Sequence, residues 1–179
     1  VMDIKMESAT GAVVGATGAI GRVCAELLAG EVARVLLVAR DEKKLEGLRD
    51  RLKVHARSEL VISTKMDVLK DAELILTVTS SIHDVIRPEH LQPGGVVCDV
   101  ARPRDVSAMV AAARDDILVI DGGMVDVPGA VNFHFNFGFP DGKAYACMAE
   151  TIALALEGRF EDYTVGKDIT LERVKDITA

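Results

Sequence analysis

Three glycines spaced three residues apart are the first candidate for chemistry in this sequence. Gly15, Gly18 and Gly21 follow the apolar run at residues 12–14 and precede a segment with helical periodicity. Glycines so placed allow a tight turn, a close approach of the backbone to a pyrophosphate, and contact between helix and strand. The phosphates would lie at the helix N-terminus, which favours anions. A purely structural turn is the alternative. We predict a dinucleotide site at Gly15, Ala16, Thr17, Gly18, Ala19, Ile20 and Gly21.

The end of the next apolar run, residues 35–38, bears on which dinucleotide would bind. An NAD site usually has an acidic residue there for the ribose 2′-hydroxyl, whereas this chain has Ala39 and Arg40. Because an arginine suits a 2′-phosphate, we predict NADP(H) as the cofactor, with Arg40 as a ligand. Two alternatives remain: Arg40 merely begins a solvated helix, or Asp41 serves NAD.

Polar and glycine residues also follow the later apolar runs. Thr79 and Ser80 come after the fourth run, and Gly122 and Gly123 come after the sixth. The carboxyl ends of parallel strands border the ligand crevice, so we predict that these four residues contact the cofactor. Helix capping is the alternative for Ser80. Asp99 follows the fifth run, where it either caps the backbone or pairs with Arg102.

Cys147 is the candidate nucleophile. Cys24 and Cys98 fall on the apolar face of a helix and inside a strand, so we expect small core residues there. Cys147 lies early in a helix, where the N-terminal dipole can favour a thiolate able to attack a thioester. A buried helical cysteine is the alternative. His134 is a candidate proton donor, and a surface histidine is its alternative.

Composition limits the function classes. The 179 residues carry 21 Lys plus Arg and 28 Asp plus Glu, a net charge of −7, with 4% aromatic residues and no Trp. An acidic chain with few aromatics is a poor partner for nucleic acids. The cysteines form no metal-binding pattern, and no apolar stretch is long enough to span a membrane. We expect a cytoplasmic protein with no metal and no integral membrane segment.

The elements that would position these residues form a β-α-β series. Apolar runs at residues 12–14, 35–38, 60–62, 74–76, 96–98 and 117–120 alternate with helical or loop connections. This pattern predicts an α/β fold with a doubly wound, mainly parallel sheet (Rossmann), in one domain over residues 1–179. The C-terminal segment, residues 124–179, would add a half-buried strand or extended stretch at 131–139. We expect helices at residues 143–157, closed by Gly158, and 171–177, capped by Thr170.

The sequence also resembles a known family. Residues 13–21, residues 36–40, the block Ala146-Cys147-Met148-Ala149-Glu150 and residues 162–170 are similar to the long-chain acyl-(acyl-carrier-protein) reductases. The resemblance implies an NADPH-dependent reductase that converts a fatty acyl thioester to an aldehyde, with Cys147 carrying the acyl group. The substrate would arrive on acyl carrier protein or CoA. The N-terminal substrate domain of that family is expected to be absent from this chain.

Two other readings stay open at this point. One is an oxidoreductase without covalent catalysis, resembling the cofactor domains of shikimate or methylene-tetrahydromethanopterin dehydrogenases. The other is a non-catalytic NADP-binding module. An acidic carrier protein would require a local basic patch, for which Arg102 and Arg104 are candidates. A homo-oligomer is a further expectation.

Overall fold

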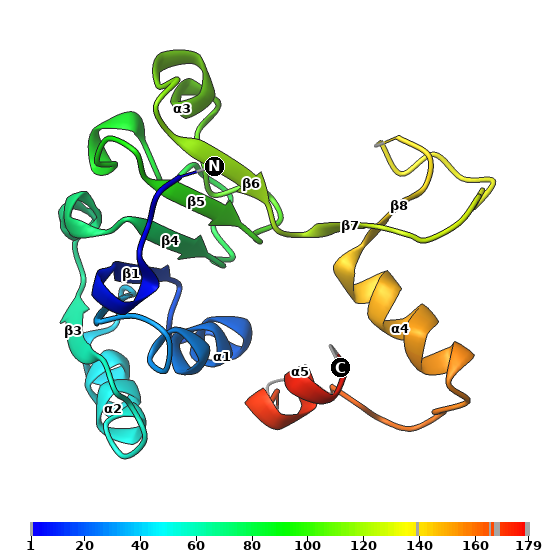
Figure 1. Cartoon of the computed structure of the whole chain (residues 1–179), viewed down its shortest axis with the longest axis horizontal. Helices are drawn as coiled ribbons and strands as arrows, with labels where there is room; N and C mark the ends of the chain where they lie inside the picture. The colour runs from blue at the N-terminus through cyan, green and yellow to red at the C-terminus, as the bar shows by residue number, and fades with distance from the viewer. Residues whose placement is uncertain (1, 139, 165, 167–168, 178–179) are drawn as a thin grey trace.

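The computed structural model describes residues 2–138, 140–164, 166 and 169–177. Its main feature is a six-stranded sheet in the order β3-β2-β1-β4-β5-β6 (Figure 1). All neighbouring strands in this sheet are parallel. The strands are β1 (Thr10–Val14), β2 (Arg34–Val38), β3 (Glu59–Ser63), β4 (Leu74–Thr77), β5 (Val96–Asp99) and β6 (Leu118–Asp121).

The strand order locates the ligand crevice. The chain runs outward from β1 to β3 on one side, then crosses back so that β4 lies on the other side of β1. Connections therefore leave β1 and β4 in opposite directions at the carboxyl edge, which opens a crevice between them. The predicted doubly wound parallel sheet is confirmed.

Both faces of the sheet are covered, because successive side chains along each strand point to opposite sides. Val13, Val35 and Leu37 pack with the helices α1 (Ala19–Leu28) and α2 (Glu42–Leu52). On the other face, Val14 and Leu36 pack with Val110 of α3 (Ala108–Ala113), with Leu69 of the 3₁₀ helix η2 (Met66–Asp71), and with Leu91, which follows the 3₁₀ helix η3 (Pro88–His90). A further 3₁₀ helix, η1 (Met6–Ser8), precedes β1.

The buried side of α1 consists partly of small residues. Gly21, Val23, Ala25 and Leu28 are buried against the sheet, whereas Ile20 and Leu27 remain 48% and 43% exposed. The small residues Gly21 and Ala25, four positions apart, bring the helix close to the strands. Ile20 and Leu27 then fall at the border of the contact.

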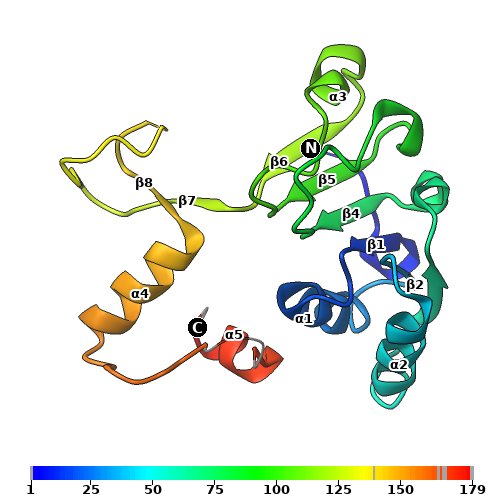
Figure 2. The same ribbon diagram turned by 180° about the vertical axis from the view of Figure 1, so that it is seen from behind.

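The C-terminal segment leaves the sheet and forms its own small elements. β7 (Met124–Asp126) pairs antiparallel with β8 (Lys143–Tyr145), and α4 (Ala146–Leu156) follows directly. Figures 1 and 2 show β7, β8 and α4 extending away from the sheet, while α5 (Leu171–Ile177) returns beside α1. Within the described part of the chain, no helix has both the length and the apolar character needed to cross a membrane.

Two expectations for this segment are corrected, namely the strand alternative for residues 131–138 and the start of the helix expected from residue 143. Residues 131–138 form no strand, and Phe139 lies outside the described residues. Asn132 Oδ1 accepts the His134 N–H at 2.7 Å, Asn136 Oδ1 accepts the Gly138 N–H at 2.8 Å, and His134 has a φ of 52°. These local turns replace a strand ladder despite the alternating phenylalanines. The helix expected from residue 143 begins at Ala146, because β8 takes the preceding three residues.

The predicted C-terminal end of α4 and the predicted N-terminal cap of α5 are confirmed. Gly158, with a φ of 69°, donates its N–H to Ala155, and Arg159 donates to Leu154. This pattern is a Schellman motif, which favours glycine because it requires a left-handed residue. Thr170 Oγ1 accepts the Arg173 N–H at 3.3 Å at the start of α5.

Candidate functional site

The turn between β1 and α1 is built on close backbone contacts. Gly15 has a φ of 84°, and the N–H groups of Gly15 and Ala16 both donate to the Val38 carbonyl, at 2.9 and 3.1 Å. The Gly18 N–H donates to the Gly15 carbonyl at 3.0 Å. A Cβ at Gly21 would lie 2.2 Å from that same carbonyl oxygen. Gly21 is therefore required for α1 to begin this close to the end of β1.

The N-terminus of α1 is available to an anion. Gly18 is the N-cap and supplies no side-chain cap, and the first turn contains no acidic residue. The first intrahelical bond within this turn runs from the Arg22 N–H to the Gly18 carbonyl, at 3.1 Å. The N–H groups that precede it have no partner within the helix, so a pyrophosphate can accept them. The residues present therefore fit the phosphates of a dinucleotide.

The crevice between β1 and β4 is narrow beneath this turn. A Cβ at Gly15 would lie 3.0 Å from the Val78 carbonyl oxygen and 3.2 Å from the Thr79 nitrogen. The glycine turn thus rests directly on the backbone that follows β4. The structure brings two sets of predicted cofactor residues together here, the glycine turn and Thr79.

Thr79 is itself held by a carboxylate that the sequence analysis did not single out. Its N–H donates to Asp105 Oδ2 at 2.8 Å, and its hydroxyl donates to Asp105 Oδ1. The same hydroxyl oxygen accepts the Ser81 N–H at 3.1 Å. The polar groups of Thr79 other than its carbonyl are therefore used within the protein. Ser80, in contrast, is exposed.

Asp99 is a second buried carboxylate at this edge. It caps backbone rather than pairing with Arg102, because it accepts the N–H groups of Ala101, Asp105 and Val106, each at 3.0 Å. Burial raises the pKa of Asp99, and the nearby charge of Asp105 adds to this effect. The backbone hydrogen bonds act in the opposite direction, because they stabilise the ionised form. The sequence indicated a backbone cap as one of two roles for Asp99, whereas no short motif signals Asp105, whose partners Thr77 and Thr79 lie 28 and 26 positions earlier.

Asp121, at the end of β6, binds two arginines. Its Oδ1 accepts from Arg102, and its Oδ2 accepts from Arg104 Nη2 at 2.8 Å. Burial alone would raise the pKa of Asp121, but its hydrogen bonds with Arg102 and the Gly123 N–H lower it overall. The charge of the proposed basic patch at Arg102 and Arg104 is thus partly offset by Asp121.

The two glycines after β6 are closely packed. A Cβ at Gly122 would lie 2.5 Å from Cys98 Sγ, and one at Gly123 would lie 2.8 Å from Arg102 Nη2. Glycine at these two positions therefore allows neighbouring side chains to approach the backbone closely.

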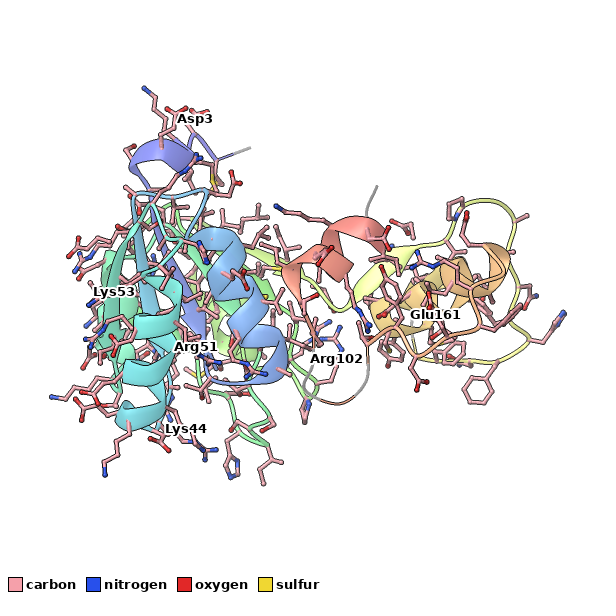
Figure 3. The ribbon with its side chains drawn as sticks, turned by 90° about the horizontal axis from the view of Figure 1, so that it is seen from below. Asp3, Lys44, Arg51, Lys53, Arg102 and Glu161 are labelled. Carbon is pink, nitrogen blue, oxygen red and sulfur yellow. The ribbon has the colours of Figure 1, made fainter. Side chains whose placement is uncertain are left out.

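Arg40 is exposed just beyond β2, and a hollow with several cationic side chains in its lining lies at the glycine turn. The hollow, about 450 Å³, lies between the glycine turn, α1 and α2; its lining is Thr17, Arg22, Lys44, Gly47, Leu48 and Arg51. Figure 3 shows Lys44 and Arg51 along α2, and Arg102 between the sheet and the C-terminal segment. The hollow could accept a phosphate group beside the glycine turn.

Asp41, the alternative ribose ligand, has a different role. Its Oδ1 accepts the Lys44 N–H at 3.1 Å as the N-cap of α2, and its Oδ2 lies 3.5 Å from Lys44 Nζ. The hydrogen bond from the Lys44 backbone is the main reason that the pKa of Asp41 is lowered. Because this carboxylate already caps a helix, the geometry disfavours it as a ligand for a ribose hydroxyl.

Cys147 is exposed and is the second residue of α4. The preceding residue, Ala146, donates its N–H to the Gly123 carbonyl at 3.0 Å. This bond fixes the start of α4 to the turn that leaves the carboxyl end of β6. Lys143, which flanks Cys147 in sequence, pairs instead with Asp126 across the hairpin, at 2.5 Å.

His134 lies in the loop between β7 and β8 and is exposed. That loop folds back onto the start of α4 through its aromatic rings. The Phe137 ring is 5.9 Å from Phe133 and 6.5 Å from Tyr145, the residue before α4. The loop that carries His134 is thus anchored near Cys147. Among the described residues, no hydrogen bond joins His134 to Cys147.

The parallel sheet, its strand order and the glycine turn define the class of Rossmann-fold dinucleotide-binding domains. Within this class, the sequence model of shikimate / quinate 5-dehydrogenases matches residues 2–121. The chain belongs to that family. The matched range includes every predicted cofactor residue except Gly122 and Gly123, and it ends before Cys147.

Two curated relatives match almost the whole chain. The aminotransferase PigE of Serratia sp. is 35% identical over 180 residues, which cover 98% of this chain and 21% of the relative. The long-chain acyl-[acyl-carrier-protein] reductase of Synechococcus elongatus is 30% identical over 184 residues, which cover 98% of this chain and 52% of the relative. This chain therefore spans about a fifth and about half of these proteins.

A solved structure supports the fold. The ligand-free 5-ketofructose reductase of Gluconobacter sp. superposes with a TM-score of 0.53 at 17% identity, covering 67% of this chain and 47% of that chain. At this level of identity the similarity concerns the fold alone.

Proposed function

We propose that this chain is the NADPH-binding and acyl-accepting part of an oxidoreductase that reduces a fatty acyl thioester to an aldehyde. The hydrogen bond from Ala146 to Gly123 carries the proposal, because it ties the helix of the exposed Cys147 to the carboxyl edge of the cofactor sheet. The similarity to an acyl-[acyl-carrier-protein] reductase over 98% of this chain supports the same activity.

The chemistry assigned to Cys147 is a thioester exchange. Its sulfur attacks the acyl carbonyl carbon, a new C–S bond forms, and the bond to the carrier sulfur breaks. The proton of the Cys147 thiol leaves with the carrier as its free thiol. NADPH, when bound, supplies the hydride that converts the acyl group to an aldehyde and frees the Cys147 sulfur. Acyl carrier protein and CoA both present such a thioester.

The position of Cys147 suits this role. α4 has eleven residues, no side-chain cap from Tyr145 at its N-cap, and no acidic residue in its first turn. Uncompensated N–H groups and the helix dipole at such an end favour a negative charge. We assign the proton donor for the developing oxyanion to His134, on the loop anchored at Tyr145.

NADPH is the proposed form of the cofactor. Arg40 follows β2, and Arg22, Lys44 and Arg51 line the hollow beside the glycine turn. A 2′-phosphate is a negative charge that such cations can bind, whereas a ribose hydroxyl is not. The use of Asp41 as a helix cap supports the same assignment.

The direct test is the intact mass of the chain after incubation with palmitoyl-CoA. We expect one palmitoyl adduct, lost in Cys147→Ser and kept in Cys24→Ala and Cys98→Ala. Addition of NADPH should then discharge the adduct and release hexadecanal, detected by gas chromatography. An adduct that persists in Cys147→Ser would contradict the assigned nucleophile.

A dehydrogenase without covalent catalysis is the second candidate. The observation that favours it is the family match, which covers the predicted cofactor site up to Asp121 and excludes Cys147. This candidate predicts NADPH-dependent reduction of a soluble ketone, with Cys147→Ser fully active and no acyl adduct. The same mass experiment therefore separates the two functions.

A further inference from the structure

A buried carboxylate beside the ligand crevice has no cationic partner among the described residues. Asp105 is fully buried, and its oxygens accept hydrogen bonds from the Thr77 hydroxyl and from the N–H and hydroxyl of Thr79. The arginines nearest in sequence, Arg102 and Arg104, pair with Asp121 instead. Burying a carboxylate without a cation is costly, so stability alone does not account for an aspartate here.

The backbone of Asp105 is fixed from two further directions. Its N–H donates to Asp99 Oδ2 at 3.0 Å, and its carbonyl accepts the N–H groups of Val85 and Ile86, at 2.9 and 3.0 Å. Asp99 is itself buried. Asp105 therefore has a fixed backbone from which its side chain can hold another segment in place.

The segment that it holds is one wall of the crevice. Thr79 contacts Asp105 through two groups, and the positions of Val78 and Thr79 lie against Gly15 on the opposite wall. A shift of Thr79 would therefore alter the support of the glycine turn. Asp105 thus binds Thr79, and the backbone at Thr79 in turn contacts the glycine turn that is assigned to the pyrophosphate.

We infer that Asp105 is a positioning residue for the dinucleotide, acting through Thr79 on the glycine turn. This inference rests on the proposed cofactor site and is independent of the acyl chemistry at Cys147. It assigns a role to a carboxylate that touches neither the phosphates nor the substrate. The inference predicts that replacing Asp105 lowers the affinity for the cofactor, and that this loss is smaller when Thr79 has already been replaced.

The experiment is a double-mutant cycle on the full chain, with NADPH affinity from fluorescence titration and Tm from thermal melting. Asp105→Asn keeps the shape but removes the charge and one acceptor, and Thr79→Val removes only the hydroxyl. We expect each to raise the Kd for NADPH, Asp105→Asn by roughly tenfold, as one charged hydrogen bond would give. The loss in the double variant should be smaller than the sum of the two single losses, because both changes break the bond between the Thr79 hydroxyl and Asp105.

Thr77→Val is the matched control. It removes the other hydroxyl that Asp105 accepts, from a strand residue that is fully buried. We expect a lower Tm with an unchanged Kd for NADPH. Equal losses of Tm in all three single variants, with no change in Kd, would overturn the inference and leave Asp105 a structural residue. If Asp105→Asn does not fold, the contrast between Thr79→Val and Thr77→Val decides the question.

The outcomes also separate this inference from the proposed function. A wild-type chain that binds NADPH but forms no palmitoyl adduct contradicts the acyl-reductase proposal, while the cycle still tests Asp105. A wild-type chain that binds neither NADPH nor NADH overturns the role of Asp105, since no dinucleotide is then positioned.

Discussion

The N–H of Ala146 donates to the carbonyl of Gly123 at 3.0 Å, which joins the helix of Cys147 to the turn after β6. Gly123 is in turn packed against the guanidinium of Arg102, and its N–H donates to Asp121. A short chain of contacts thus connects the candidate nucleophile to the carboxyl edge of the sheet. Gly123 and Ala146, which are 23 positions apart in the sequence, therefore join the edge of the proposed cofactor site to the helix of the proposed nucleophile.

Replacement of Gly21 tests the close contact between α1 and the glycine turn. In Gly21→Ala, the new Cβ would lie 2.2 Å from the Gly15 carbonyl oxygen, so backbone must move. We expect a loss of about 1–3 kcal/mol in unfolding free energy, typical of overpacking, and weaker NADPH binding. Urea denaturation and fluorescence titration measure the two effects.

Gly47→Ala is the control for this prediction. Gly47 lies inside α2, and a Cβ there meets no atom within 4 Å. Alanine in a helix interior should raise the stability by about 0.5–1 kcal/mol. A Gly21→Ala variant as stable as Gly47→Ala would contradict the packing described for the turn.

Charge removal near β2 tests the cofactor preference. The double variant Arg40→Gln/Lys44→Gln should raise the Kd for NADPH by roughly tenfold or more, because charge-assisted bonds to phosphate are lost. The Kd for NADH should change little, since NADH has no 2′-phosphate. Arg49→Gln is the control, because Arg49 pairs with Asp50 on α2 and does not line the hollow. Equal effects on both cofactors would argue against a 2′-phosphate site.

Acid titration tests the Asp121 cluster. The pKa of Asp121 is lowered in the folded chain, so the unfolded state, with a pKa of about 3.9, binds protons more readily. Its contribution to stability is therefore present above about pH 3.9 and is lost as the pH falls through the lower folded pKa. Asp121→Asn should remove this component. We expect the wild type to lose more stability than Asp121→Asn between pH 5 and 2, measured by urea denaturation.

The three cysteines should differ in reactivity. Burial raises the pKa of Cys24, with a contribution from Cys98. Burial also raises the pKa of Cys98, with contributions from Asp99 and Asp121. Cys147 is exposed. Because the thiolate is the reactive form, iodoacetamide at pH 7.5 should modify Cys147 first, as peptide mass spectrometry would reveal. First modification of Cys24 in the native chain would contradict the partial burial of this thiol.

The sheet was the most predictable part of the molecule. Apolar runs such as residues 35–38 and 96–98 indicate buried parallel strands because both faces of such strands are covered. The glycine turn and the Asp41 cap were predictable for a related reason. Each of these two features depends on residues within a few positions of one another, so a short stretch of sequence is enough to predict it.

The C-terminal segment and the aspartate network were less predictable. The phenylalanines from 133 to 137 alternate as in a strand, but Asn132 and Asn136 form local bonds that outcompete a ladder. The β7–β8 pair requires three residues to meet partners about 20 positions away, which no periodicity reveals. Asp105 depends on Thr79, 26 positions earlier, and that contact exists only once the sheet has formed.

The hairpin of β7 and β8 allows the loop that it closes to vary while the start of α4 stays fixed to the sheet. Its ladder closes a loop over residues 127–142, and the entropy of closing such a loop grows only slowly, by about 0.6 kcal/mol for each doubling of length. The loop can therefore lengthen, shorten or change composition at little thermodynamic cost while Ala146 stays bonded to Gly123. Relatives that keep this hairpin are free to diversify what surrounds Cys147 while retaining the sheet that would hold the cofactor.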